Sequence, residues 1–245
     1  MSGTAPSSDE IPGRLAEVDR RIKASARKVG RDPAEIKLIA VSKTHPPDVL
    51  RRAIEAGASD LGENRVQEAD SKILELGRDA ARWHLIGHLQ ANKARRAVML
   101  FDVIHSLDSV SLARRLDRLC EDLERDELPV LIQVDLGDEA TKSGVSEEEL
   151  PELVRAVIEC RRLRLIGLMT LPPFFDEIEL VRPYFQRLRL LRDSLKAQEV
   201  FGSGVGELSM GMSHDYGVAI EEGATFVRVG TAIFGEREAA GLNAD

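Results

Sequence analysis

A regular alternation of short apolar segments with longer amphipathic ones most constrains the fold of this chain. Short apolar segments bounded by turn residues are typical of buried strands, and the longer segments have the apolar spacing of helices. Strands that alternate with helices in one run form parallel sheets with right-handed crossovers. The expected strands are 37–42, 59–62, 83–87, 103–107, 130–136, 163–169, 207–210 and 225–229.

Eight such units predict an α/β protein, a compact single-domain (β/α)8 barrel of the TIM type. Between the strands, helices are expected at 48–56, 66–76, 109–123, 147–159 and 180–197. An extra helix at 12–29 precedes the first strand and ends at Gly30. The chain ends soon after the eighth strand, so this leading helix is expected to cover the place of an eighth outer helix. We expect the barrel to span 11–236, with flexible ends at 1–10 and 237–245. An open doubly wound sheet is the alternative, but it needs an edge and a dinucleotide fingerprint.

Composition favours a small-molecule protein. A net charge of -8 and an aromatic content of 4% argue against nucleic-acid binding, which normally uses basic surfaces and stacking rings. The N-terminus lacks the regions of a signal peptide, and no apolar run approaches the roughly 20 residues that span a membrane. The two cysteines form no Cys-x-x-Cys pair, so free thiols in a reducing compartment are expected. The sequence therefore predicts a cytoplasmic protein with no membrane and no nucleic-acid partner.

Lys43 closes the first apolar segment, at the end of a strand where barrels place their functional groups. A lysine there acts as a fixed cation for an anion or, when desolvated, as a neutral amine that attacks a carbonyl. The five histidines are dispersed, and no pair has the spacing of a helical metal motif, so no metal site is expected. His84 lies within an expected strand and is predicted to be a hydrogen-bonded core residue.

Two turns near the C-terminus have features of a phosphate-binding site. Segment 211–215 joins the seventh strand to a helix-like stretch at 216–222, and Ser213 and Asp215 are both suitable N-caps there. The eighth strand ends at Gly230-Thr231, a small turn whose amides can face an anion. Turns after strands seven and eight are the usual phosphate position of barrels. A carbonyl-seeking lysine beside a phosphate cradle fits a sugar-phosphate aldolase or a protein that holds pyridoxal phosphate (PLP), and the residues alone leave both open.

Six segments carry a resemblance to a known family. They are AVSKT at 40–44, GENRVQE at 62–68, WHLIGHLQ at 83–90, IHSLD at 104–108, LSMGMS at 208–213 and VRVGT at 227–231. In this order they resemble the hallmark segments of the pyridoxal phosphate homeostasis protein family, also called the YggS-like or proline synthase co-transcribed family. The resemblance runs from about residue 11 to residue 235.

The resemblance implies a barrel like the N-terminal domain of alanine racemase that binds pyridoxal 5'-phosphate. It implies that Lys43 holds the cofactor as a Schiff base, the lysine aldimine. It places Ser213 and the Gly230-Thr231 turn at the phosphate and Arg228 near the pyridine nitrogen. Asn64 and Met210 are expected to line the ring.

The same residues favour a carrier over a catalyst. An arginine stays protonated and leaves the facing ring nitrogen unprotonated, which makes the ring a poor electron sink. Racemisation needs two opposed acid–base groups, and in related racemases the second comes from a C-terminal domain that we do not expect here. Tyr184 and Tyr216 are expected to pack rather than to act as that base.

What the resemblance implies is a cytoplasmic, monomeric protein of vitamin B6 homeostasis. It would buffer PLP and supply apo PLP-dependent enzymes, without robust turnover. A PLP-dependent amino-acid racemase and a Schiff-base aldolase are the alternatives.

Overall fold

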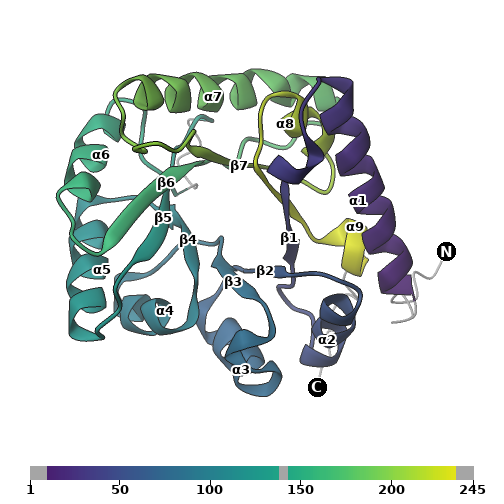
Figure 1. The fold of residues 1–245 in the computed structure, drawn as a ribbon, viewed down its shortest axis with the longest axis horizontal. Coiled ribbons are helices and arrows are strands. Elements are labelled where there is room, and N and C mark those ends of the chain that lie inside the picture. Colours follow the sequence, from purple (N-terminus) through teal and green to yellow (C-terminus); the bar gives the residue numbers. More distant parts are fainter. Residues whose placement is uncertain (1–9, 138–142, 236–245) are drawn as a thin grey trace, which may run out of the picture.

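A computed structural model describes residues 10–137 and 143–235, and in it the strands form one closed parallel barrel (Figure 1). Each strand pairs in parallel with the next, and β8 returns to pair with β1. The predicted (β/α)8 fold is confirmed. The strands are β1 Lys37–Val41, β2 Asp60–Glu63, β3 Arg82–Leu85, β4 Val103–Leu107, β5 Leu128–Gln133, β6 Leu163–Met169, β7 Glu207–Met212 and β8 Phe226–Val229.

The strand bounds differ from the expected ones mainly at β3, β5 and β7. β3 ends at Leu85, two residues before the expected end. β5 ends at Gln133, three residues before the expected end, because its partner Met169 is the last residue of β6. β7 continues to Met212, two residues further than expected, through an irregularity in its pairing with β8. Residues 1–9 and 236–245 lie outside the described residues, so the flexible ends remain a prediction.

Helices surround the barrel, and most lie where the sequence pattern places them. Two short helices, α4 and α9, were not singled out from the sequence. The helices are α1 Ile11–Lys28, α2 Pro47–Glu55, α3 Val66–Leu76, α4 Ala94–Leu100, α5 Val110–Asp122, α6 Leu150–Ile158, α7 Arg182–Ala197, α8 Tyr216–Glu221 and α9 Thr231–Phe234.

The leading helix α1 covers the side of the barrel where β8 closes against β1. Its buried residues recur every three or four positions, so they form one apolar stripe along the helix. Figure 1 shows α1 beside α8 and α9, and these helices are in contact. The expectation that this helix fills the place of an eighth outer helix agrees with the structure. The buried residues of α1 are Ile11, Leu15, Val18, Ile22 and Ala26.

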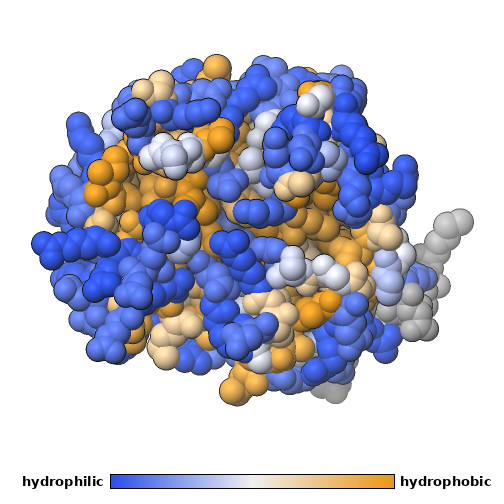
Figure 2. All heavy atoms as spheres, in the orientation of Figure 1, coloured by the Kyte–Doolittle hydropathy of each residue, from blue (hydrophilic) through white to orange (hydrophobic). Residues whose placement is uncertain are grey.

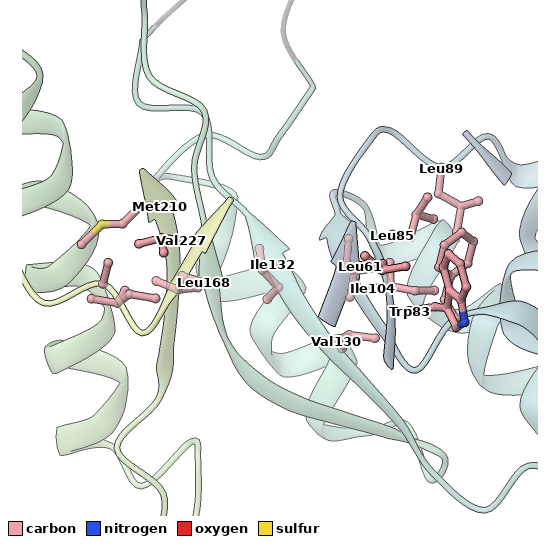
Figure 3. Close-up of a cluster of buried hydrophobic side chains, with 14 of the residues drawn as sticks. Leu61, Trp83, Leu85, Leu89, Ile104, Val130, Ile132, Leu168, Met210 and Val227 are labelled. Carbon is pink, nitrogen blue, oxygen red and sulfur yellow. The ribbon is translucent and has the colours of Figure 1, made fainter. Parts of the chain in front are cut away.

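The core has two parts because successive strand residues point to opposite sides of the barrel wall. The larger part lies between the barrel and the helices, and Figure 3 shows some of its side chains, such as Trp83, Ile104 and Leu168. A smaller cluster inside the barrel contains Ile39, Val103, Leu131, Met169 and Phe226.

Hydrophilic side chains cover most of the face in Figure 2, and apolar ones gather towards its middle. Among the helices of the described residues, each is too short or too polar to span a bilayer.

Candidate functional site

A cavity of about 930 Å³ lies at the carboxyl ends of the strands, and it brings together six of the seven predicted site residues. These residues come from the ends of β1, β2, β7 and β8, which are far apart in the sequence. Met210 is not among the lining residues. The six are Lys43, Asn64, Ser213, Arg228, Gly230 and Thr231.

A larger cavity, of about 1280 Å³, lies at the opposite end of the barrel, where Lys37, Arg82 and Glu207 begin their strands. Barrel enzymes carry out their chemistry at the carboxyl ends of the strands. The smaller cavity is therefore the candidate site.

The backbone on both sides of Lys43 is held by charged side chains of α3. Lys72 Nζ donates a hydrogen bond of 2.7 Å to the carbonyl of Ser42. The Glu68 carboxylate accepts a hydrogen bond from the amide of Thr44. Thr44 has a φ of 69°, in the left-handed region that a non-glycine residue rarely adopts. These contacts fix the turn from which the partly buried Lys43 reaches the cavity.

Lys72 and Glu63 form a buried ion pair behind this turn. Lys72 Nζ lies 2.6 Å from Glu63 Oε1 and 2.7 Å from Glu68 Oε1, and the Ser42 hydroxyl donates to Glu63 Oε1 at 2.6 Å. Burial raises the pKa of Glu63, although Lys72 and Ser42 act in the opposite direction. Sequence reasoning missed this network, because a lysine on an amphipathic helix is expected to face the solvent. The i, i+4 spacing of Glu68 and Lys72 was the available signal.

The Ser213 hydroxyl joins the two turns that carry the phosphate signal. Its oxygen accepts hydrogen bonds from the amides of Gly230 at 3.2 Å and Ala232 at 3.4 Å. A side chain at position 230 would approach the carbonyl of Val41 to 3.3 Å, so a small residue suits this turn. The structure thus assembles the hydroxyl and the amides that the sequence suggested for an anion.

Asp215 occupies the N-cap position of α8, but neither it nor Ser213 caps that helix through its side chain. The Asp215 carboxylate instead accepts a hydrogen bond of 2.6 Å from the amide of Met212. Burial raises the pKa of Asp215. Both side chains therefore stabilise the turns at the cavity rather than the helix.

Arg228 brings a buried positive charge to the cavity wall. It is 2% exposed, and its guanidinium donates to Ser209 Oγ at 2.6 Å and to the carbonyl of Thr170 at 2.8 Å. No carboxylate of the described residues forms a salt bridge with it. Burial lowers the pKa of Arg228 to about 10, so it remains charged at neutral pH. A guanidinium has five donors, and those left over suit a ligand with an acceptor atom at this wall.

Met212 takes the place at the cavity that was expected for Met210. Ser209 pairs with Phe226 and Met212 pairs with Arg228, so β7 advances three residues where β8 advances two. This irregularity is a β-bulge, and Gly211 within it has a φ of 90°. Met210 is fully buried in the outer core, where Figure 3 draws it near Val227. Met212 lines the cavity and is 37% exposed. The structure thus places Met210 away from the cavity where it was expected, because the bulge turns Met212, two residues further along β7, towards the cavity instead.

His88, in the loop after β3, also lines the cavity and was not predicted as a site residue. Its Nδ1 lies 3.0 Å from Asp108 Oδ2, and burial raises the pKa of Asp108. Tyr216 is buried, and the guanidinium of Arg21 lies 5.5 Å from its ring centre. Tyr184 packs on Phe175. Neither tyrosine lines the cavity, in keeping with the packing role expected for both.

Within residues 10–137 and 143–235, no group of three or more His, Cys, Asp and Glu side chains is arranged to hold a metal ion.

Comparison with known proteins places the fold in a family. Residues 14–238 match the model of the alanine racemase N-terminal domain. The crystal structure of alanine racemase from Corynebacterium glutamicum superposes with a TM-score of 0.64 at 18% identity, over 94% of this chain and 62% of that one. Fold and site together define a barrel protein of the alanine racemase N-terminal type.

Closer relatives narrow the class. The pyridoxal phosphate homeostasis proteins of Aquifex aeolicus and Escherichia coli K12 are each 44% identical to this chain, covering 92% and 94% of it and 97% and 98% of their own lengths. PipY from Synechococcus elongatus, solved with PLP bound, superposes with a TM-score of 0.77 at 39% identity, over 92% of this chain and all of that one. The chain belongs to the pyridoxal phosphate homeostasis protein family, as the sequence segments indicated.

Proposed function

We propose that this chain binds PLP covalently through Lys43 and serves PLP homeostasis as a carrier of the cofactor. The observation that carries the proposal is the buried Arg228, which faces the same cavity as Lys43 with donors to spare and no carboxylate partner among the described residues. A buried charge of this kind is costly unless polar groups satisfy it. A pyridine nitrogen is an acceptor that suits it.

The remaining residues fit the other parts of the cofactor. Ser213 and the Gly230-Thr231 turn lie together at the cavity and would hold the phosphate through a hydroxyl and backbone amides. Asn64 and Met212 line the same cavity and would contact the ring. When bound, PLP supplies an aldehyde that a lysine amine can capture and a ring that can accept electrons.

Arg228 favours binding of the cofactor over catalysis with it. A guanidinium that remains protonated leaves a facing ring nitrogen without its proton, and the ring then draws electrons weakly. The names of the relatives point to the same role, since they are homeostasis proteins. We further propose that the protein works as a monomer in the cytoplasm, with apo PLP-dependent enzymes as recipients. Both cysteines are free thiols, which suits a reducing compartment.

The test is cofactor capture by the purified protein. PLP is added, the visible spectrum is recorded, and borohydride reduction followed by peptide mapping locates the label. We expect a visible band and a label on Lys43, both lost in Lys43→Ala and retained in Lys37→Ala, a lysine at the other end of β1. No band, or a label on another lysine, contradicts the proposal. Labelling by a sugar phosphate without PLP favours the aldolase instead.

A second candidate is residual amino-acid racemisation, favoured by the His88–Asp108 pair. A carboxylate at one imidazole nitrogen orients the ring and leaves Nε2 available for proton transfer beside the cavity. If the protein exchanges the α-hydrogen of amino acids in heavy water with PLP present, His88→Asn should slow that exchange at unchanged cofactor binding. Wild-type protein without catalytic exchange supports the carrier alone.

A further inference from the structure

Behind Arg228, an unbroken row of hydrogen bonds crosses the interior of the barrel. Arg228 donates to Ser209 Oγ at 2.6 Å, and Ser209 Oγ lies 2.9 Å from His105 Nδ1. His105 Nε2 lies 2.9 Å from His84 Nδ1. The row ends where His84 Nε2 lies 2.8 Å from Asp60 Oδ1. These side chains come from β8, β7, β4, β3 and β2, so the row joins five of the eight strands.

Burial isolates this row from water. His84, His105 and Ser209 are 0% exposed, and the ring of Phe226 packs edge-on against both imidazoles, with centroid distances of 5.8 Å and 5.3 Å. The Asp60 side chain is 13% exposed, at the start of β2. Burial lowers the pKa of His84, and it lowers the pKa of His105 well below the ordinary value. Both imidazoles are therefore neutral at physiological pH.

The two ends of the row determine where every proton lies. Asp60 also accepts from the Ser59 hydroxyl, and its hydrogen bonds outweigh burial and lower its pKa, so it is an ionised acceptor. His84 must then carry its proton on Nε2, which leaves its Nδ1 as the acceptor for His105 Nε2–H. His105 Nδ1 in turn accepts from the Ser209 hydroxyl, whose oxygen accepts from Arg228. Every donor points away from Arg228 and towards Asp60.

This direction has an electrostatic consequence at the cavity. The acceptor that Arg228 meets is the neutral Ser209 hydroxyl oxygen, whereas the negative charge of Asp60 lies four hydrogen bonds away from the guanidinium. Asp215, the carboxylate whose charge most supports Arg228, is engaged by the Met212 amide rather than by the guanidinium. Arg228 is thus stabilised as a cation without a carboxylate that would occupy its remaining donors. Aligned dipoles in a low dielectric strengthen one another, so the stabilisation extends along the row.

We propose that Asp60, His84, His105 and Ser209 are positioning residues that hold Arg228 as a protonated donor for the ring nitrogen of bound PLP. The role towards PLP rests on the proposed function, whereas the direction of the row is a property of the chain itself. Asp60 is the informative residue because it does not line the cavity.

The first experiment measures the direction of the row without cofactor. Nitrogen-15 spectra of the histidine side chains are recorded on the cofactor-free protein, with His84→Gln and His105→Gln to assign the signals. We expect both histidines to be neutral at pH 7 with the proton on Nε2. A proton on Nδ1 of either ring, or a charged ring, overturns the proposed direction.

The second experiment measures PLP affinity in Asp60→Asn, with Glu207→Gln as the matched control. Glu207 is a carboxylate at the same end of the barrel that pairs only loosely with Lys37, at 3.7 Å. We expect about a fivefold loss of affinity in Asp60→Asn, about tenfold in Ser209→Ala, and less than about twofold in the control. The pH dependence of the absorption band of bound PLP should differ from that of wild type in Asp60→Asn and Ser209→Ala. In Glu207→Gln it should match wild type.

The outcomes separate the two proposals. If wild-type protein takes up no PLP, the proposed function fails, and the role of the row towards PLP fails with it. If Asp60→Asn matches the control while wild type binds PLP, only the positioning role fails. Thermal unfolding shows whether Asp60→Asn folds. Should it not, Ser59→Ala removes one hydrogen bond from the same carboxylate and should weaken binding in the same direction by less, and no weakening contradicts the role.

Discussion

Two buried polar networks support the two halves of the candidate site, and they differ in the charge of the side chains that form them. The network behind Lys43 lies outside the barrel wall and consists of full charges, Glu63, Lys72 and Glu68. The network behind Arg228 lies inside the barrel and consists mainly of neutral hydrogen-bonding groups. The first fixes a backbone turn, for which paired charges are suitable. The second reaches the cavity wall, where a nearby carboxylate would compete with the ligand for Arg228.

The largest expected effect comes from breaking the charged network. Lys72→Met leaves Glu63 buried without its partner, and removal of one member of a buried pair costs about 3–5 kcal/mol of unfolding free energy. Urea unfolding measures the loss. Lys23→Met is the matched control, because Lys23 pairs with Asp19 on the exposed face of α1, and it should change stability by less than about 1 kcal/mol.

The double variant Lys72→Met with Glu63→Leu sharpens this test, because it removes both charges. It should recover much of the stability that Lys72→Met loses. Equal losses in the single and double variants would show that the lysine acts through packing rather than through its charge.

A smaller effect is expected from the neutral network. Ser209→Ala leaves an Arg228 donor and His105 Nδ1 without partners, which costs about 1–3 kcal/mol because two buried groups lose one hydrogen bond each. The same urea titration measures it. A loss as large as that of Lys72→Met would contradict the contrast between charged and neutral networks.

The smallest effect is a difference in response to acid. The pKa values of His84 and His105 are lowered by folding, so the unfolded chain binds protons more readily once the pH falls below about 6.5. The contribution of these two histidines to the free energy of unfolding is therefore fully present above that pH. Below it, this contribution falls by up to about 1.4 kcal/mol per pH unit for each histidine. Glu63, whose pKa is raised, acts in the opposite direction at lower pH, since its protonation favours the folded state.

Unfolding free energies measured between pH 7.5 and 5.5 check this sign. His105→Gln should have a shallower decline than wild type over the same range. An unchanged slope would mean that His105 titrates alike in the folded and unfolded states.

Strand and helix periodicity was sufficient to predict the barrel and the order of its elements, and the chain itself marks Lys43 at a strand end and Ser213 in a turn. The roles of Arg228 and Asn64 were expected only from the resemblance to the family. Met210 could not be distinguished from Met212, because the bulge at Gly211 depends on pairing with β8. The partners of His105 were not predictable either, since they lie on β3 and β7 and meet only when the barrel closes. Lys72 contradicts the usual rule that lysine is exposed, and only tertiary structure reveals its acidic partners.

The position of α1 has a consequence for how the barrel is made. Lys28, at the end of this helix, pairs with Glu221, and Arg31 just beyond it donates to the carbonyls of Ile220 and Ala224. During synthesis α1 is therefore made about 190 residues before the segment that covers the rest of its apolar stripe. β1 likewise gains one of its two neighbours only when β8 has been synthesised. During translation the early part of the chain has an exposed strand edge and an uncovered helix, and these are the features that call for a chaperone or a slow final closure.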